Sequence, residues 1–461
     1  QILRTGFLWD GVQQPLQVVM EQVDLEIQRY DWSRNSIDQA EEKFQRYLVD
    51  DRNLGFGFKR PGVLRLLWIA MPDDEHRLIW SFHHILLDGW SLPIVFGELF
   101  TSYEALATGK ELVLPPAPRY QDFIAWHVRQ DRNKAQIFWR EYLKGFSAAT
   151  PIPVKNAAAI VAQRGREGDS ASRYREAQMA VSGTLLDGLQ LLAKQHRMTL
   201  NHIRQGVWAA LLERYSGESD VLFGTTVSGR PADLAGIENM VGLFINTLPL
   251  RLRIDKQAPF IDWLQAQQDA QAELKFYEYS SLVDVQKASD LPAKQAMFES
   301  ILVFENYPID ETLEETQASL RIGNVDAFQQ TNFPLTLIII PGRELLLRFS
   351  YDSHLFEPVV IERMLGHIQQ MLAAIHQNPT ILINQLPLLT ETERGRVVDL
   401  WNDTARPFPD QATLMELFEQ QVQARPNQIA CEFGDQRISY ERLNSKANQL
   451  ARVLISQGVK P

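Results

Sequence analysis

A strand, a turn and a helix between residues 77 and 108 constrain this chain most, because histidine, aspartate and glycine side chains meet in the turn. Residues 77–82 are rich in branched and aromatic side chains, which is typical of a buried strand. Ser91 then caps an expected helix over 92–108. One side of that helix carries Leu92, Phe96, Leu99, Phe100, Tyr103 and Leu106. The turn therefore lies where a polar side chain can project into a cleft.

The turn contains the pattern His-His-x-x-x-Asp-Gly, from His83 to Gly89. A single histidine beside apolar residues is usually a packed core residue, but at average residue usage this longer pattern occurs by chance in on the order of one in a thousand such chains. Histidine exchanges protons near neutral pH, and His84 lies where the strand gives way to the turn and a side chain can project into a cleft, so His84 is a candidate catalytic residue. Asp88 either braces the turn, which we favour, or raises the basicity of His84. Gly89 either serves the turn alone or offers its N–H group to a developing oxyanion.

The composition excludes several classes of protein. Of 461 residues, 45% are hydrophobic and 22% are charged, which is ordinary for a soluble protein with two or three cores. The net charge of −11 is spread along the chain, so no basic groove for nucleic acid is expected. No apolar run is long enough to cross a membrane. The lone Cys431 excludes an intrachain disulfide and fits a reducing cytoplasm.

Strands alternate with helices along the rest of the chain, which predicts an α/β fold. Beyond the turn, expected helices cover 36–50, 121–143, 184–196, 200–215, 260–277 and 357–376. Expected strands cover 58–71, 174–181, 220–227, 299–304, 335–340 and 345–351. The stiff, proline-rich run 114–119 is a candidate boundary between two lobes, and 157–172 is expected to be a mobile loop.

Several motifs in order resemble one family. Besides the histidine pattern, these are Ile2–Phe7, Tyr120–Trp126, and Val241–Thr247 followed by Arg251. Together they resemble the condensation domains of nonribosomal peptide synthetases, which are relatives of chloramphenicol acetyltransferase. The resemblance covers about residues 1–385.

The resemblance implies a chloramphenicol-acetyltransferase-like α/β fold whose two lobes form a V around a central tunnel. Residues 1–117 would form the N-terminal lobe, with its start missing, and 118–385 the C-terminal lobe. His84 would lie in the tunnel, supported by His83 and by an ion pair between Asp88 and Arg230. Asn246 and Tyr351 are candidate tunnel-lining residues, with the alternative that each is an ordinary polar residue at a strand end.

The implied reaction joins an acyl or peptidyl thioester to an aminoacyl thioester through an amide bond. Donor and acceptor carrier proteins would present both substrates on phosphopantetheine arms. No metal or directly bound cofactor is expected, and the sequence has neither a zinc-ligand pattern nor a Gly-rich phosphate loop. His84 would orient the attacking amine and accept its proton late, or act as a general base.

The chain changes character after about residue 385. Residues 386–405 resemble the linker between a condensation and an adenylation domain. Residues 406–461 resemble the start of an adenylation domain, because Ile438–Leu443 matches its first motif. The phosphate loop and the ribose-binding aspartate of that domain do not appear, so we expect no amino-acid activation.

Other functions share parts of this pattern. An epimerization domain has the same histidine motif, but the run Asp88–Leu92 is closer to condensation sequences. A heterocyclization domain would replace the histidines with aspartates. A catalytically silent platform that binds carrier proteins is a third alternative, and a stand-alone acyltransferase is a fourth. Product formation from two loaded carrier proteins would separate these hypotheses.

Overall fold

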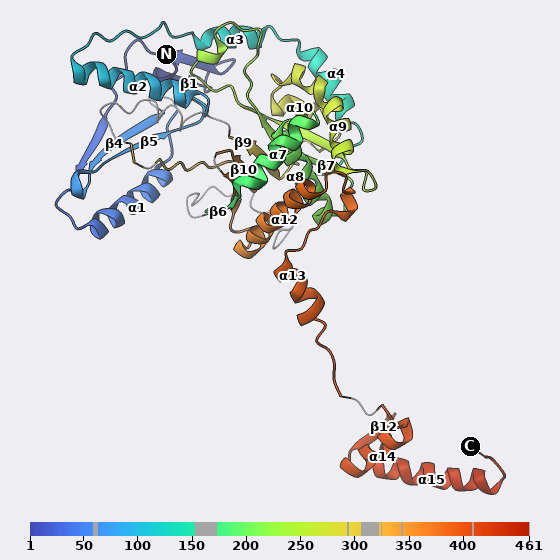
Figure 1. The fold of residues 1–461 in the computed structure, drawn as a ribbon. Helices are drawn as coiled ribbons and strands as arrows, with labels where there is room; N and C mark the ends of the chain where they lie inside the picture. Colours follow the sequence, from blue (N-terminus) through green and yellow to red (C-terminus); the bar gives the residue numbers. More distant parts are fainter. Residues whose placement is uncertain are drawn as a thin grey trace. The chain divides into compact units, whose positions relative to one another are not determined.

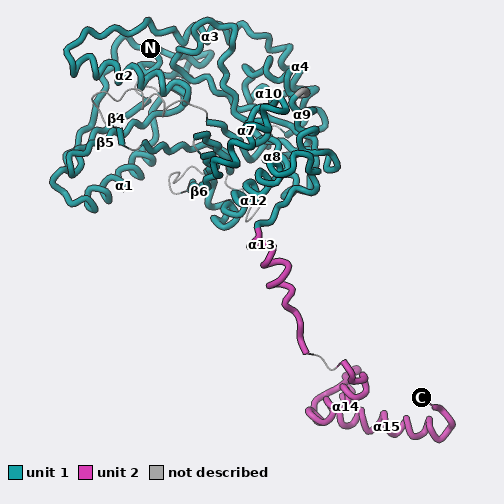
Figure 2. Tube along the Cα trace, viewed as in Figure 1, with its two compact units in different colours: residues 1–390 teal, residues 391–461 magenta. Residues whose placement is uncertain are grey.

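The computed structural model describes residues 1–58, 63–152, 173–292, 295–305, 322–323, 325–342, 344–407 and 410–460, with the backbone alone at 269 and 270. The loop expected over 157–172 lies outside these residues. The chain divides into two compact units, Gln1–Thr390 and Glu391–Pro461, which are coloured separately in Figure 2.

The N-terminal part of the first unit contains a small sheet with strand order β3-β4-β5. Its strands are β3 (Ile27–Asp31), β4 (Leu64–Ala70) and β5 (His76–Phe82), and a separate hairpin pairs β1 (Thr5–Leu8) with β2 (Leu16–Val19). Because β3 and β4 are parallel, a crossover must join them, and helix α1 (Ile37–Leu54) provides it. Ser36 caps α1 by accepting the Gln39 N–H group.

The C-terminal part of the first unit is built on a six-stranded mixed sheet with order β6-β11-β10-β9-β7-β8. The strands are β6 (Tyr174–Val181), β7 (Asp220–Val227), β8 (Asn246–Arg253), β9 (Ser300–Phe304), β10 (Leu335–Ile340) and β11 (Leu345–Asp352). Figure 1 shows this sheet and the three-stranded sheet in different parts of the first unit.

Helices cover both faces of the six-stranded sheet. The larger core packs one face against α7 (Gly183–Gln195), α8 (Leu200–Ser216), α9 (Phe260–Gln271) and α12 (Pro358–Gln377). The other face packs against α4 (Arg132–Tyr142) and α10 (Leu282–Ala288). Alternation along β9 sends Leu302 to the larger core and Ile301 to the smaller one. The α/β fold expected from the sequence is confirmed.

Two expected helices differ from the structure. Helix α2 (Ser91–Thr108) has buried residues at both ends, Ser91 and Ala105, and its Phe96 ring lies 5.6 Å from the Trp80 ring. The expected apolar side is not a continuous core face, since Leu99 is 45% exposed and Leu106 is 81% exposed. The single helix expected over 121–143 is interrupted between α3 (Tyr120–Val128) and α4, because Asp131 caps a new helix start by accepting from the Lys134 N–H group.

The first unit ends at Thr390. Leu386 is buried in the larger core and Leu388 packs against it, so the chain leaves this core after both. The second unit begins with α13 (Glu391–Gly395) and a π-helical turn over Arg396–Leu400. It continues with helices α14 (Leu414–Ala424) and α15 (Tyr440–Ser456) and the hairpin of β12 (Ile429–Phe433) with β13 (Gln436–Ser439). Of the helices that the structure describes, none has the length and apolarity needed to span a membrane.

Candidate active site

His84 lies in the turn between β5 and α2 and is exposed. Its Nδ1 atom lies 3.2 Å from the Leu87 carbonyl oxygen. A carbonyl oxygen can only accept a hydrogen bond, so Nδ1 carries the proton and donates it. In the neutral ring, Nε2 then keeps its lone pair and can accept a proton. Local backbone therefore sets the tautomer that a general base requires.

His83 is held by the same turn in a different way. Its Nδ1 atom accepts a hydrogen bond of 3.0 Å from the Ile85 N–H group. Its ring stands edge-on to Phe58, with 4.8 Å between centroids. Partial burial against such neighbours lowers the pKa of His83, and the adjacent His84 lowers it further. These contacts fit the supporting role expected for His83.

Asp88 is fully buried and its carboxylate is saturated with donors. One oxygen, Oδ1, accepts from the backbone N–H of Ser91 at 3.0 Å and from the Ser91 hydroxyl at 2.9 Å. The other, Oδ2, accepts from the backbone N–H groups of Phe244 at 3.0 Å and Ile245 at 3.3 Å. An enclosed carboxylate of this kind fixes backbone position. The geometry therefore favours bracing over chemistry among the roles expected for Asp88.

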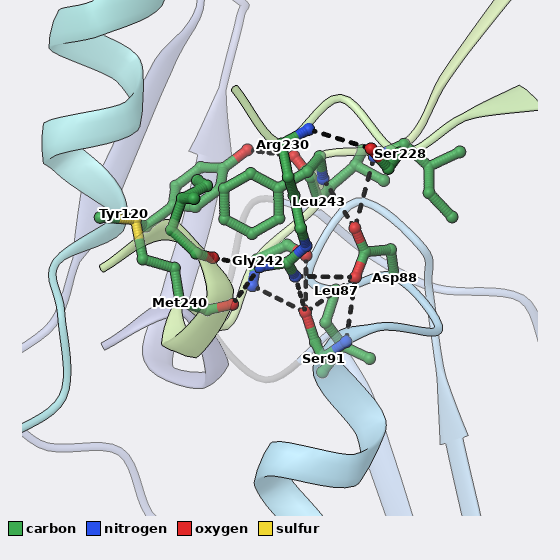
Figure 3. A network of polar contacts seen from close by, with 12 residues as sticks. Leu87, Asp88, Ser91, Tyr120, Ser228, Arg230, Met240, Gly242 and Leu243 are labelled. Carbon is green, nitrogen blue, oxygen red and sulfur yellow. Dashed lines mark hydrogen bonds and ion pairs between the residues drawn. The ribbon is translucent and has the colours of Figure 1, made fainter. Parts of the chain in front are cut away.

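Arg230 completes the cluster around Asp88, as Figure 3 shows. Its Nη2 atom lies 3.3 Å from Asp88 Oδ1, which forms the ion pair implied by the resemblance. Its Nη1 atom donates to the carbonyl oxygens of Ile237 and Met240, and its guanidinium stacks 4.0 Å over the Phe244 ring. Burial lowers the pKa of Arg230, while Asp88 acts in the opposite direction. The arginine thus ties the turn at residues 83–91 to the segment between β7 and β8.

Three residues of this cluster were not singled out as site residues from the sequence. The Ser91 hydroxyl accepts from the Gly242 N–H group at 3.1 Å, and the Tyr120 hydroxyl donates to the Leu243 carbonyl oxygen at 2.5 Å. A Cβ atom on Gly242 would lie 2.1 Å from the Tyr120 ring, so a side chain cannot fit there. Ser91 was expected to cap α2, but helix α2 starts at Ser91 and Asp88 accepts its N–H group instead. The contact of Ser91 with Gly242 could not be predicted from local sequence patterns, because the two residues lie 151 positions apart.

We call the cluster of Asp88, Ser91, Arg230 and Gly242 the Asp88 network. It joins the turn that carries His84 to the C-terminal part of the unit. Backbone groups take part in this connection as well as side chains, since the Asp88 N–H group also donates to the Gly242 carbonyl oxygen at 3.1 Å. The network therefore sets the position of the His84 turn relative to the six-stranded sheet.

Gly89 follows Asp88 directly and is buried. Its φ angle is not positive, so the turn does not require glycine for a left-handed conformation. Its carbonyl oxygen accepts from the Leu92 N–H group at 3.2 Å. Its own N–H group has no acceptor among the residues that the structure describes.

The two candidate tunnel-lining residues lie elsewhere. The Asn246 amide donates to the carbonyl oxygens of Glu278 at 2.8 Å and Ser280 at 2.6 Å, so it ties β8 to a neighbouring segment. Tyr351 is 3% exposed and belongs to the larger core. This burial favours the alternative that Tyr351 is an ordinary residue at a strand end, and its tunnel-lining role stays a prediction.

Two of the cavities formed by the described residues are small, and His84 lines neither of them. One lies between α7 and α12 and is lined by Thr184 and His376. The other lies beneath α8. The tunnel expected around His84 therefore stays a prediction. Among the described residues, no group of three histidine, cysteine, aspartate or glutamate side chains is arranged to hold a metal ion.

Comparisons with known proteins agree on one family. The family model described as "Condensation domain" matches residues 1–398. One of the linear gramicidin synthase proteins of Brevibacillus parabrevis is 42% identical over 470 residues, which cover all of this chain and 9% of that protein. Tyrocidine synthase 2 of the same organism is 36% identical over 462 residues, covering 99% of this chain and 12% of that protein. The chain thus spans about a tenth of these relatives.

Solved structures share the fold. A four-domain nonribosomal peptide synthetase bound to AMP and glycine superimposes with a TM-score of 0.77 at 20% identity, covering 100% of this chain and 35% of that one. The first condensation domain of the CDA synthetase superimposes with a TM-score of 0.64 at 17% identity, covering 84% of this chain and 87% of that one.

Proposed function

The chain belongs to the condensation-domain family of nonribosomal peptide synthetases, and we propose that it forms an amide bond between two thioester substrates carried on phosphopantetheine arms of donor and acceptor carrier proteins. The fold is the chloramphenicol-acetyltransferase-like α/β fold of that family. The proposal rests on the exposure of His84 and on its tautomer. Nδ1 donates its proton to the Leu87 carbonyl oxygen, which leaves the lone pair of Nε2 available.

In this reaction the amine nitrogen of the acceptor attacks the thioester carbonyl carbon of the donor. A C–N bond forms, the C–S bond breaks, and the donor's thiol leaves. An α-amine has a pKa of about 7.7–8.0, so an appreciable fraction is already neutral and His84 need not be a strong base. We propose that His84 Nε2 first orients the amine and then accepts its surplus proton as the bond forms. The departing thiolate finally takes up a proton.

Positioning is the other source of rate. A thioester is already activated, so holding two bound arms in reacting geometry removes much of the barrier. The Asp88 network contributes by fixing the turn that carries His84, and no proton transfer is assigned to Asp88. The Gly89 N–H group, which has no acceptor among the described residues, is our candidate donor to the thioester oxygen as it becomes an oxyanion.

The second unit is proposed to be the start of an adenylation domain, joined by a linker to the condensation domain. The motif at Ile438–Leu443 supports this assignment, as does the exposed apolar surface of the unit, where Leu414 is 83% exposed. Surfaces of this kind are normally covered by the rest of a domain. The single free thiol, Cys431, is exposed, which fits the reducing cytoplasm that we propose for this reaction.

The test compares two neighbouring histidines. His84→Ala should retain the thermal stability of the wild type, because the side chain is exposed, and should lose amide formation by about 10²–10⁴-fold. The matched control is His83→Asn, whose side-chain oxygen can still accept the Ile85 N–H group, and it should keep most activity. The measurement is product formation between two loaded carrier proteins, followed by mass spectrometry. A fully active His84→Ala protein would remove His84 from the chemistry.

A further inference from the structure

A positively charged side chain lies in the larger core without a counterion among the residues that the structure describes. Arg204 on α8 is 2% exposed, and its Nε, Nη1 and Nη2 atoms have no hydrogen-bond partner in the part of the chain that the structure describes. The Phe304 ring lies 4.6 Å from its guanidinium carbon. A ring face offers weak attraction to a cation but replaces none of its hydrogen bonds. Burying a charge in this way is costly unless something pairs with it.

The described carboxylates of the neighbouring strands do not meet this need. The charge of Arg348, which lies on β11 opposite Ile338 of β10, partly offsets the rise in the pKa of both Glu176 and Glu305, so these carboxyls lie near Arg348. Side chains alternate along a strand, and Ile338 packs in the smaller core, on the face away from α8. Burial is the cause that lowers the pKa of Arg204 to about 9, with no carboxylate acting against it. The guanidinium therefore still carries its charge at neutral pH.

A second unpaired donor lies beside Arg204. Trp208 follows it by one helical turn, is fully buried, and has an Nε1–H group without an acceptor among the described residues. Both side chains line the same cavity of about 10 Å³. The remaining walls are apolar and are formed by Val207, Leu337, Ile339, Leu347, Ile368 and Leu372. A cavity of this volume holds roughly one water-sized particle.

The chemistry of the cavity defines its occupant. Every polar side-chain group in its wall is a hydrogen-bond donor, and one of these groups is charged. The occupant that fits such a wall is a small, negatively charged hydrogen-bond acceptor. A water molecule could accept two hydrogen bonds but would leave the charge of Arg204 uncompensated. A carboxylate-bearing metabolite is too large for the space. We propose that this cavity is a structural binding site for one monovalent anion of the size of chloride, held by Arg204 and Trp208.

The first experiment measures thermal stability in sodium chloride and in sodium gluconate at equal ionic strength, because gluconate is too large to enter. An anion that binds the folded protein alone should raise the melting temperature of the wild type by about 2 °C for each tenfold increase above its dissociation constant. Arg204→Leu replaces the charge with an apolar side chain and should lose the difference between the two salts. The matched control is Arg363→Leu on α12, where the arginine is exposed, and it should behave as the wild type.

The second experiment needs no variant. Crystals of the wild-type chain grown in sodium bromide should show an anomalous bromide peak between the Arg204 guanidinium and the Trp208 indole nitrogen. A water molecule or no density at that place would overturn the proposal. Equal melting temperatures of the wild type in the two salts would also overturn it, as would a chloride-specific rise that persists in Arg204→Leu.

Discussion

At the scale of single residues, His84 and Asp88 have different roles in the turn. His84 is exposed and its ring makes one hydrogen bond to the backbone, so it is free to meet a substrate. Asp88 is enclosed and its two oxygens accept from backbone, hydroxyl and guanidinium donors. Four residues of sequence therefore separate a side chain suited to chemistry from one suited to holding the chain in place.

Loss of the Asp88 carboxylate is expected to destabilise the first unit strongly. Asp88→Ala leaves the buried charge of Arg230 without its carboxylate partner and the N–H groups of Phe244 and Ile245 without an acceptor, and breaking a buried pair costs about 3–5 kcal/mol. The control is Asp122→Ala, which breaks an exposed pair with Arg119 and should cost less than about 1 kcal/mol. Urea unfolding of both variants, with the condensation assay beside it, makes the comparison.

One outcome of that comparison, and one further double variant, test the bracing role of Asp88. An Asp88→Ala protein that is as stable as the wild type but inactive would make Asp88 a catalytic partner of His84 and contradict the bracing role. Exchange of the two charges, Asp88→Arg with Arg230→Asp, should not restore stability. An arginine at position 88 would present donors to the N–H groups of Phe244 and Ile245, which need an acceptor.

At the scale of elements, the segment between β7 and β8 must pass close to its own backbone to reach the Asp88 network. Gly229 has a φ of +60°, and a Cβ atom there would lie 1.8 Å from the Phe244 carbonyl oxygen. Gly217 has a φ of +77° at the end of α8, with open space around it. The two glycines share the left-handed conformation and differ in the room around them.

This difference gives a prediction with its own control. Gly217→Ala should cost about 1 kcal/mol through backbone strain alone. Gly229→Ala should cost more and should also lower activity, because its clash moves Arg230 and with it the His84 turn. Urea unfolding and the condensation assay on both variants test this expectation. Equal losses of stability, with full activity in Gly229→Ala, would show that the segment tolerates the shift.

A half-buried carboxyl at the end of β9 should make stability depend on pH. Burial raises the pKa of Glu305, and the nearby Arg348 only partly offsets the effect. Because the pKa of Glu305 is higher in the folded than in the unfolded state, its contribution to stability is fully present below the pKa of the unfolded state. This contribution is lost as the pH rises through the pKa of the folded state. Glu305→Gln should therefore raise the melting temperature by about 2 °C at pH 8 and leave it unchanged at pH 4. The same gain in Glu362→Gln, an exposed carboxylate on α12, would contradict this cause.

The elements also show what sequence reasoning could reach. Strands β10 and β11 and helices α8 and α12 could be predicted from periodicity and caps, and at the start of α8 the cap is Thr199, which accepts the His202 N–H group. The exposed far end of α2 could not be foreseen, because an apolar stripe does not say what covers it. The burial of Tyr351 could not be predicted, because alternation gives the two faces of a strand without telling which is buried. The ion pair of Asp88 with Arg230 came from family resemblance, since the two residues lie 142 positions apart.

At the scale of the whole molecule, the two units differ in how they are stabilised. The first unit has large cores on both faces of its main sheet. In the second unit, none of the residues that the structure describes is buried, and Phe433 is 87% exposed. Its secondary structure therefore depends on local caps, such as the capping box of Thr413 with Glu416. Local interactions such as helix caps rarely stabilise a fold of this length without a hydrophobic core.

Hydrogen exchange should expose this difference directly. In the 461-residue chain, amides of α14 and α15 should exchange within about an order of magnitude of the unfolded rate, since few contacts oppose local opening. Amides of α8, which is buried along most of its length, should be protected up to the global stability of the first unit. In a longer chain that includes a complete adenylation domain, α15 should become protected, because its apolar face would then be covered. Protection of α15 equal to that of α8 in the 461-residue chain would show that the second unit is stable by itself and would remove exposure as an argument for a missing partner surface.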